Sequence, residues 1–94
     1  MKTVNEMKLC VPSKGCNEAF ARSVVSAFIM NLDPTVSELS DLKTAVSEAV
    51  TNCIVHGYRR QSGMIYINGK ITAENKVIIT IRDKGRSEER RVGK

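Results

Sequence analysis

A carboxylate, a carboxamide and an imidazole recur at intervals of four residues in the segment EAVTNCIVHGY: Glu48, Asn52 and His56. In a helix this spacing places them along one flank, with successive Cβ atoms about 6 Å apart. A carboxamide oxygen can bind a hard cation such as Mg²⁺, and a nearby carboxylate can accept a hydroxyl proton. Both groups suit metal-assisted phosphoryl transfer. The same spacing also fits a solvated helix face, so both interpretations stay open for this segment alone.

A second polar group follows the apolar run VIITI, where Asp83 and Gly85 are separated by one residue. An aspartate at the end of a strand can accept a hydrogen bond from an exocyclic amine such as that of adenine. A glycine beside it lets the backbone approach a flat ring closely. The alternative is an ordinary Asp-x-Gly turn.

Two helices are predicted to position the first group. Apolar residues at helical spacing follow Asn17, a possible cap, and include Phe20 and Val24; this helix ends at Leu32-Asp33-Pro34. Arg22 and Ser26 fall outside its apolar stripe. N-terminal helix signals at residues 34–38 start the second helix, which runs to about Val55.

Alternation of apolar and polar residues predicts three strands, at residues 7–11, 64–71 and 76–82. Ala73-Glu74-Asn75 is short enough for a hairpin, so the last two strands should be antiparallel neighbours. The resulting β-α-α-β-β order predicts an α+β fold, a two-layer sandwich with both helices on one face of the sheet. The last nine residues, RSEERRVGK, show no apolar periodicity and are predicted to have nothing to pack against.

Composition restricts the class of protein. The chain has 94 residues, which is enough for one domain, and 41% of them are hydrophobic. Of the net charge of +5, residues 86–94 carry +2 and the remainder +3, and aromatic residues are only 4%, so a nucleic-acid stacking platform is not expected. With no membrane-length apolar run and no leader pattern at the N-terminus, a cytoplasmic protein is expected. The spacing of Cys10, Cys16 and Cys53 predicts buried, reduced thiols.

Taken together and in this order, the two polar groups resemble the ATP-binding fold shared by gyrase, Hsp90, histidine kinases and MutL. Over its whole length, the segment FARSVVSAFIMNLDPTVSELSDLKTAVSEAVTNCIVHGY is similar to the anti-sigma F family of serine kinases from spore-forming Firmicutes. The resemblance covers about residues 7–85. It implies a histidine-kinase-like ATPase domain that uses ATP and Mg²⁺.

The resemblance also implies roles for individual residues. Asn52 would hold Mg²⁺ against the ATP phosphates, and Glu48 would be the base for a serine hydroxyl of the substrate. Asp83 would bind the adenine amine, with Gly85 beside the ring. Arg22 matches an arginine that the family presents to protein partners, although an ordinary solvated arginine is an equal alternative.

The implied partners are a sigma factor of the sigma F type, an anti-anti-sigma factor that is phosphorylated on serine, and a second copy of the intact protein. Neither nucleic acid nor membrane is expected as a direct partner. Two alternatives are a general-stress anti-sigma kinase and a non-catalytic interaction module.

The sequence departs from the family pattern after Gly85. Where the family has a second glycine this chain has Arg86, and no Gly-rich phosphate-binding turn follows. Residues 1–85 are therefore interpreted as a partial ATPase domain, incomplete at its C-terminus. Residues 86–94 are interpreted as a non-homologous tail that resembles a translated sequencing adapter. ATP binding by this chain alone is expected to be weak.

Overall fold

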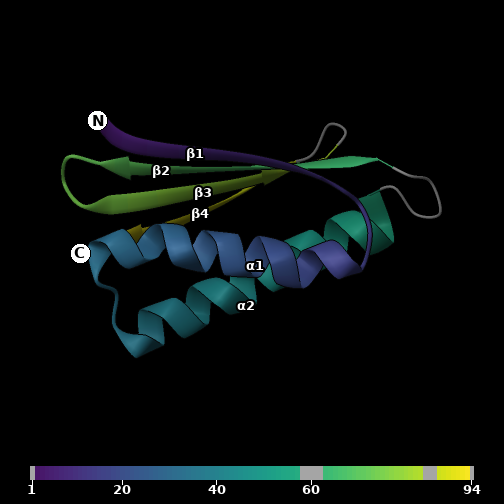
Figure 1. Ribbon diagram of the computed structural model, residues 1–94, viewed down its shortest axis with the longest axis horizontal. Coiled ribbons are helices and arrows are strands. Elements are labelled where there is room, and N and C mark those ends of the chain that lie inside the picture. The colour runs from purple at the N-terminus through teal and green to yellow at the C-terminus, as the bar shows by residue number, and fades with distance from the viewer. Residues whose placement is uncertain (1, 58–62, 84–86, 94) are drawn as a thin grey trace.

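In the computed structural model, residues 2–57, 63–83 and 87–93 are described, and they form a four-stranded sheet with two α-helices on one face (Figure 1). The elements in chain order are β1 (Thr3–Pro12), α1 (Cys16–Ile29), a 3₁₀ turn (Met30–Leu32), α2 (Val36–Asn52), a π-helical turn (Cys53–Gly57), β2 (Met64–Thr72), β3 (Lys76–Arg82) and β4 (Ser87–Gly93).

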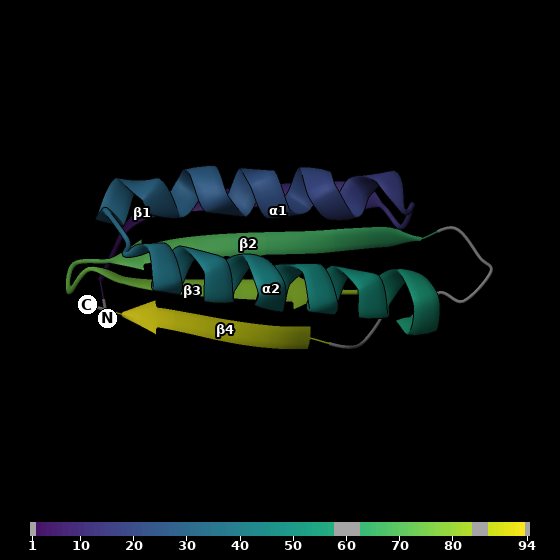
Figure 2. The same ribbon diagram turned by 90° about the horizontal axis from the view of Figure 1, so that it is seen from below.

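The strands follow the spatial order β1-β2-β3-β4, and each neighbouring pair is antiparallel. Helix α1 lies over β1 and β2, and α2 lies over β3 and β4 (Figure 2). The other face of the sheet carries no helix among the described residues. The predicted two-layer α+β architecture is confirmed.

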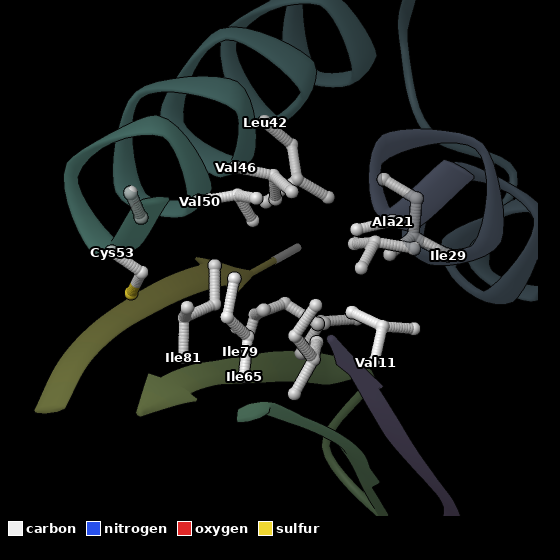
Figure 3. Packing of buried hydrophobic residues seen from close by; sticks show 14 of the residues in the cluster. Val11, Ala21, Ile29, Leu42, Val46, Val50, Cys53, Ile65, Ile79 and Ile81 are labelled. Atoms are coloured by element: carbon white, nitrogen blue, oxygen red, sulfur yellow. The ribbon is translucent and has the colours of Figure 1, made fainter. Parts of the chain in front are cut away.

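The core lies between the sheet and the two helices (Figure 3). Alternate residues of the two central strands face it, as the sequence predicts. They meet two helical stripes, one from α1 and one from α2. The buried side chains are Val11, Ala21, Val25, Ile29, Leu42, Val46, Ala49, Val50, Cys53, Ile65, Ile67, Ile71, Val77, Ile79 and Ile81.

Helix α2 starts at the predicted position with a reciprocal capping box. The Thr35 hydroxyl accepts a hydrogen bond from the Glu38 backbone N–H at 3.0 Å. The Glu38 carboxylate accepts one from the Thr35 N–H at 2.8 Å. Two N–H groups that the helix leaves unpaired are thereby satisfied, which fixes where the helix begins.

The predicted hairpin between β2 and β3 is also confirmed. The Asn75 N–H donates to the Thr72 carbonyl at 3.0 Å, and Asn75 adopts a left-handed conformation with φ of 62°. Asparagine tolerates this conformation better than most residues. The turn sets the register in which Ile71 pairs with Val77.

The fourth strand differs from the sequence prediction. Residues 87–93 pair with β3 in a continuous register, for example Ile79 with Arg90, so the expectation that this segment has nothing to pack against is wrong. Backbone hydrogen bonding to a free strand edge does not require an alternating side-chain pattern. The proposed origin of residues 86–94 remains a prediction.

Three local predictions are corrected. The α1 N-cap is Gly15, whereas the Asn17 side chain donates to the Pro12 carbonyl at 2.8 Å. Cys53 is buried, but Cys10 and Cys16 are exposed, and all three thiols are free. No helix in the described part of the chain is both long and apolar enough to cross a membrane.

Gly69 lies where α1 approaches the sheet most closely, which gives a test of this packing. A Cβ added there would lie 2.9 Å from Cε2 of Phe28 and 3.0 Å from Cγ of Met7. We expect Gly69→Ala to lower the free energy of unfolding by about 1–3 kcal/mol in urea titrations. Gly15→Ala is the control, because nothing lies within 4 Å of its added Cβ and its φ of −54° suits alanine. Equal losses in both variants would contradict this packing.

Candidate functional site

The rotation of α2 determines which of its polar residues reach solvent. Its buried residues are Leu42, Val46, Ala49 and Val50, and these face the sheet. Glu48 and Asn52 lie outside this stripe and are exposed. The predicted i, i+4 relationship between them is confirmed, since both belong to the same regular α-helix.

Glu48 and Asn52 line an open hollow on α2 together with two hydroxyl-bearing residues, Ser47 and Thr51. The hollow has a volume of about 370 Å³. It brings together a carboxylate that can accept a proton, a carboxamide oxygen that can bind a hard cation, and two hydroxyls that can donate to phosphate oxygens. Sequence reasoning missed Ser47 and Thr51, although their positions one before and three after Glu48 could have indicated them.

His56 is not part of the hollow's lining. It is exposed and belongs to the π-helical turn that follows α2. The wider hydrogen-bonding pattern of a π turn changes the angular step between residues, so the i, i+4 alignment does not extend regularly beyond Asn52. The structure therefore brings together two of the three residues in the predicted polar stripe.

Asp83 directly follows β3 and is only 3% exposed. It has the same strand parity as the buried Ile79 and Ile81, which places it on the side of the sheet that α2 covers. Ile81 and Cys53 lie close together in Figure 3, so the end of β3 is beneath the end of α2. Asp83 is therefore at the same end of the molecule as Asn52. Gly85 lies outside the described residues.

Arg22 reaches from α1 to α2. Its Nη1 donates to the Glu18 carboxylate and to the Ser47 hydroxyl, each at 3.2 Å. The Arg22 side chain is 39% exposed, so it is neither buried nor fully solvated. Because Ser47 lines the hollow, the arginine predicted to contact protein partners also touches the rim of the predicted nucleotide site.

A protein-only metal centre is not found among residues 2–57, 63–83 and 87–93, where no three His, Cys, Asp or Glu side chains cluster. Mg²⁺ commonly takes one or two protein oxygens and completes its shell with phosphate and water. The single exposed carboxamide of Asn52 fits this kind of binding, with the ATP phosphates as the other ligands.

A larger hollow of about 590 Å³ lies on the helix-free face of the sheet. Cations dominate its lining, with Lys8, Lys70 and Arg82 against the carboxylate of Glu89. The Arg82 guanidinium lies over the Tyr66 ring, 5.0 Å from the centroid. Since the carboxylate and carboxamide suited to phosphoryl transfer lie across the sheet on α2, the smaller hollow is the better candidate despite its size.

Comparison with known proteins gives consistent matches. Residues 12–93 match the model of the histidine kinase-like ATPase domain. The "Anti-sigma F factor" of a Thermoanaerobacter species is 52% identical over 89 residues, covering 95% of this chain and 62% of the relative. The protein of that name from Clostridium beijerinckii is 54% identical over 82 residues, or 86% of this chain and 57% of the relative. The chain thus spans about three-fifths of the length of these relatives.

The bridge from α1 to the hollow can be measured with a double-mutant cycle. We expect Arg22→Ala and Ser47→Ala to show a coupling energy of about 0.5–1 kcal/mol in urea unfolding, because each removes the same partly exposed hydrogen bond. Glu18→Ala combined with Ser47→Ala is the control, since these two side chains share no bond with each other. Additive effects of Arg22→Ala and Ser47→Ala would show that the bridge contributes nothing to stability.

Proposed function

Because the chain belongs to the histidine kinase-like ATPase family, we propose that the protein acts as an ATP-dependent anti-sigma factor and serine kinase. It binds and inhibits a sporulation sigma factor of the sigma F type, and it phosphorylates an anti-anti-sigma factor on serine. The observation that carries this proposal is the hollow on α2, where Glu48 and Asn52 lie one turn apart in a chain 52% identical to an anti-sigma F factor. The activity is proposed for the protein at the full length of its relatives.

Glu48 is the proposed general base. Its carboxylate is exposed in the hollow, so a serine of a second protein can reach it. There it accepts the serine hydroxyl proton as the oxygen attacks the terminal phosphorus. The adjacent hydroxyls of Ser47 and Thr51 can orient the incoming group by hydrogen bonding.

Asn52 is the proposed metal ligand. Bound Mg²⁺-ATP supplies the phosphoryl group and the charge neutralisation that its transfer requires. Asn52 contributes a neutral oxygen, which holds the cation without adding a second negative charge beside Glu48. This division of roles between neighbouring residues fits an arrangement in which the carboxylate remains available for the proton.

Asp83 and Gly85 are the proposed adenine-binding residues. The carboxylate of Asp83 is buried beneath the end of α2, where a flat base could be sheltered from water. A carboxylate accepts a hydrogen bond from the adenine amine and disfavours a carbonyl at the same position, so it favours adenine over guanine. Gly85 would lie against the ring.

Arg22 is the proposed contact for protein partners. It is partly exposed on α1, and its cation suits an acidic group of the sigma factor or of the anti-anti-sigma factor. The protein is further proposed to form a homodimer and to work in the cytoplasm.

Glu48→Gln tests the catalytic role. We expect phosphorylation of the anti-anti-sigma factor by the full-length protein to fall by about 10²–10⁴-fold, because glutamine cannot accept the proton. Mg²⁺-ATP affinity, measured by calorimetry, should remain unchanged. Asp41→Asn, an exposed position two turns earlier on α2, is the control and should retain activity. Equal phosphorylation by Glu48→Gln and wild type would remove the base assignment; loss of nucleotide binding in the wild type would favour a non-catalytic interaction module.

Asn52→Ala tests the metal role. We expect it to weaken Mg²⁺-ATP binding by about tenfold or more, equivalent to about 1.4 kcal/mol, while ATP affinity in EDTA changes little. Asn52→Asp retains an oxygen ligand and should keep the dependence on Mg²⁺. A loss of affinity that is the same with and without Mg²⁺ would show that Asn52 binds the nucleotide in another way.

A further inference from the structure

Strand β1 forms one end of the sheet, and β2 is its only strand partner in the described chain. It is ten residues long, so its outer edge presents an extended row of backbone hydrogen-bonding groups. Such an edge can pair with another strand unless charges or distortions prevent it. The bulge between Thr3 and Asn5 disrupts one end of the edge and leaves the remainder regular.

The register identifies which backbone groups point outward. The Ser13 N–H donates to the Gly63 carbonyl at 2.8 Å, and the same register continues to Met7, which pairs with Gly69. Since hydrogen-bonded pairs alternate along an antiparallel ladder, the odd-numbered residues from 7 to 13 bond to β2. Glu6 and Lys8, which are exposed, therefore direct their N–H and C=O groups away from the sheet.

Hydrogen bonding at Glu6 agrees with this direction. Its N–H donates to the Asn5 side-chain oxygen at 2.9 Å, a contact that a pairing strand could replace with a backbone carbonyl. Pro12, which has no N–H, also falls at an outward position, where no ladder bond to β2 is lost.

The charges on this edge complement themselves in one register. Two β1 strands placed antiparallel about a two-fold axis through Met7 would set Glu6 opposite Lys8 of the partner subunit and Lys8 opposite the partner's Glu6. A slip of two residues in either direction would set lysine against lysine or glutamate against glutamate. Opposite charges facing each other stabilise a strand pair, and like charges destabilise it.

Helix α1, which lies over β1, carries an exposed apolar stripe beside this edge. Its buried residues include Ala21 and Val25, which face the core, and Arg22 points toward α2. On the helical wheel, Phe20, Val24 and Ala27 then lie on the side remote from α2, above the outer edge of β1. Phe20 is 50% exposed there.

We propose that a second copy of this chain binds through the β1 edge and the adjacent stripe of Phe20, Val24 and Ala27, with the two-fold axis at Met7. The two sheets join into one continuous sheet, and the two α1 stripes pack against each other above it. This specifies the surface for the self-association included in the proposed function. It requires neither nucleotide nor kinase activity, so its failure and that of the kinase assignment are distinguishable.

Cross-linking tests the position of the axis in the full-length protein. Facing residues at a non-hydrogen-bonded antiparallel pair have Cα atoms about 4.5 Å apart, within disulfide range. We expect Met7→Cys, in a Cys10→Ser and Cys16→Ser background, to form a disulfide dimer on mild oxidation. The native Cys10 should not cross-link to itself, because the two-fold axis separates it widely from its counterpart. Cross-linking through Cys10 and not through position 7 would overturn the proposed register.

Charge reversal tests the pairing without altering the core. We expect Glu6→Lys and Lys8→Glu each to raise the dimer dissociation constant by about tenfold in sedimentation experiments at low salt, and the double variant to return it to within about threefold of wild type. Phe20→Ser should weaken the dimer by about tenfold or more, whereas Met30→Ser, exposed on another side of the turn that follows α1, should not. A wild-type monomer, or a double variant no better than the singles, would overturn the proposal.

Discussion

The packing of α2 on the isoleucines of β2 and β3 is the constraint on which the candidate site depends. Val46 and Val50 are fully buried against a layer that includes Ile65 and Ile79. Turning the helix to bury Glu48 would remove these methyl groups from the core and desolvate a carboxylate, and both changes are costly. The hydrophobic stripe therefore holds the polar flank of α2 toward solvent, where a nucleotide and a protein substrate could reach it.

Much of this arrangement could be predicted because its determinants are local. The Thr35 and Glu38 signals start α2 where expected, and strict alternation identifies the core face of β3. Strand β4 could not be predicted in this way, because SEERRVG has no alternation and its pairing depends on the free edge of β3. The role of Phe20 was also beyond local reasoning. Its stripe and the neighbouring one through Ala21 both have helical spacing, and only the position of the sheet decides which is buried.

The candidate site shows the same division. Glu48 and Asn52 could be paired from spacing alone, because one α-helix fixes their separation. The bond from Arg22 to Ser47 joins residues 25 positions apart, and its formation depends on how α1 and α2 lie on the sheet. Asp83 could be placed at the end of a strand, but its burial beneath α2 is a property of the tertiary fold.

Helix α1 links these parts because it uses three of its sides. One side carries Ala21 and Val25 into the core, a second reaches α2 through Arg22, and a third holds Phe20 over the β1 edge. The close approach of Phe28 to Gly69 fixes the height of the helix above the sheet. Rotating α1 to improve the contact on one side would break the contacts on the other two. A close-packed core resists such continuous adjustment, so the orientation of Arg22 toward the hollow and of Phe20 toward the edge are consequences of one packing solution.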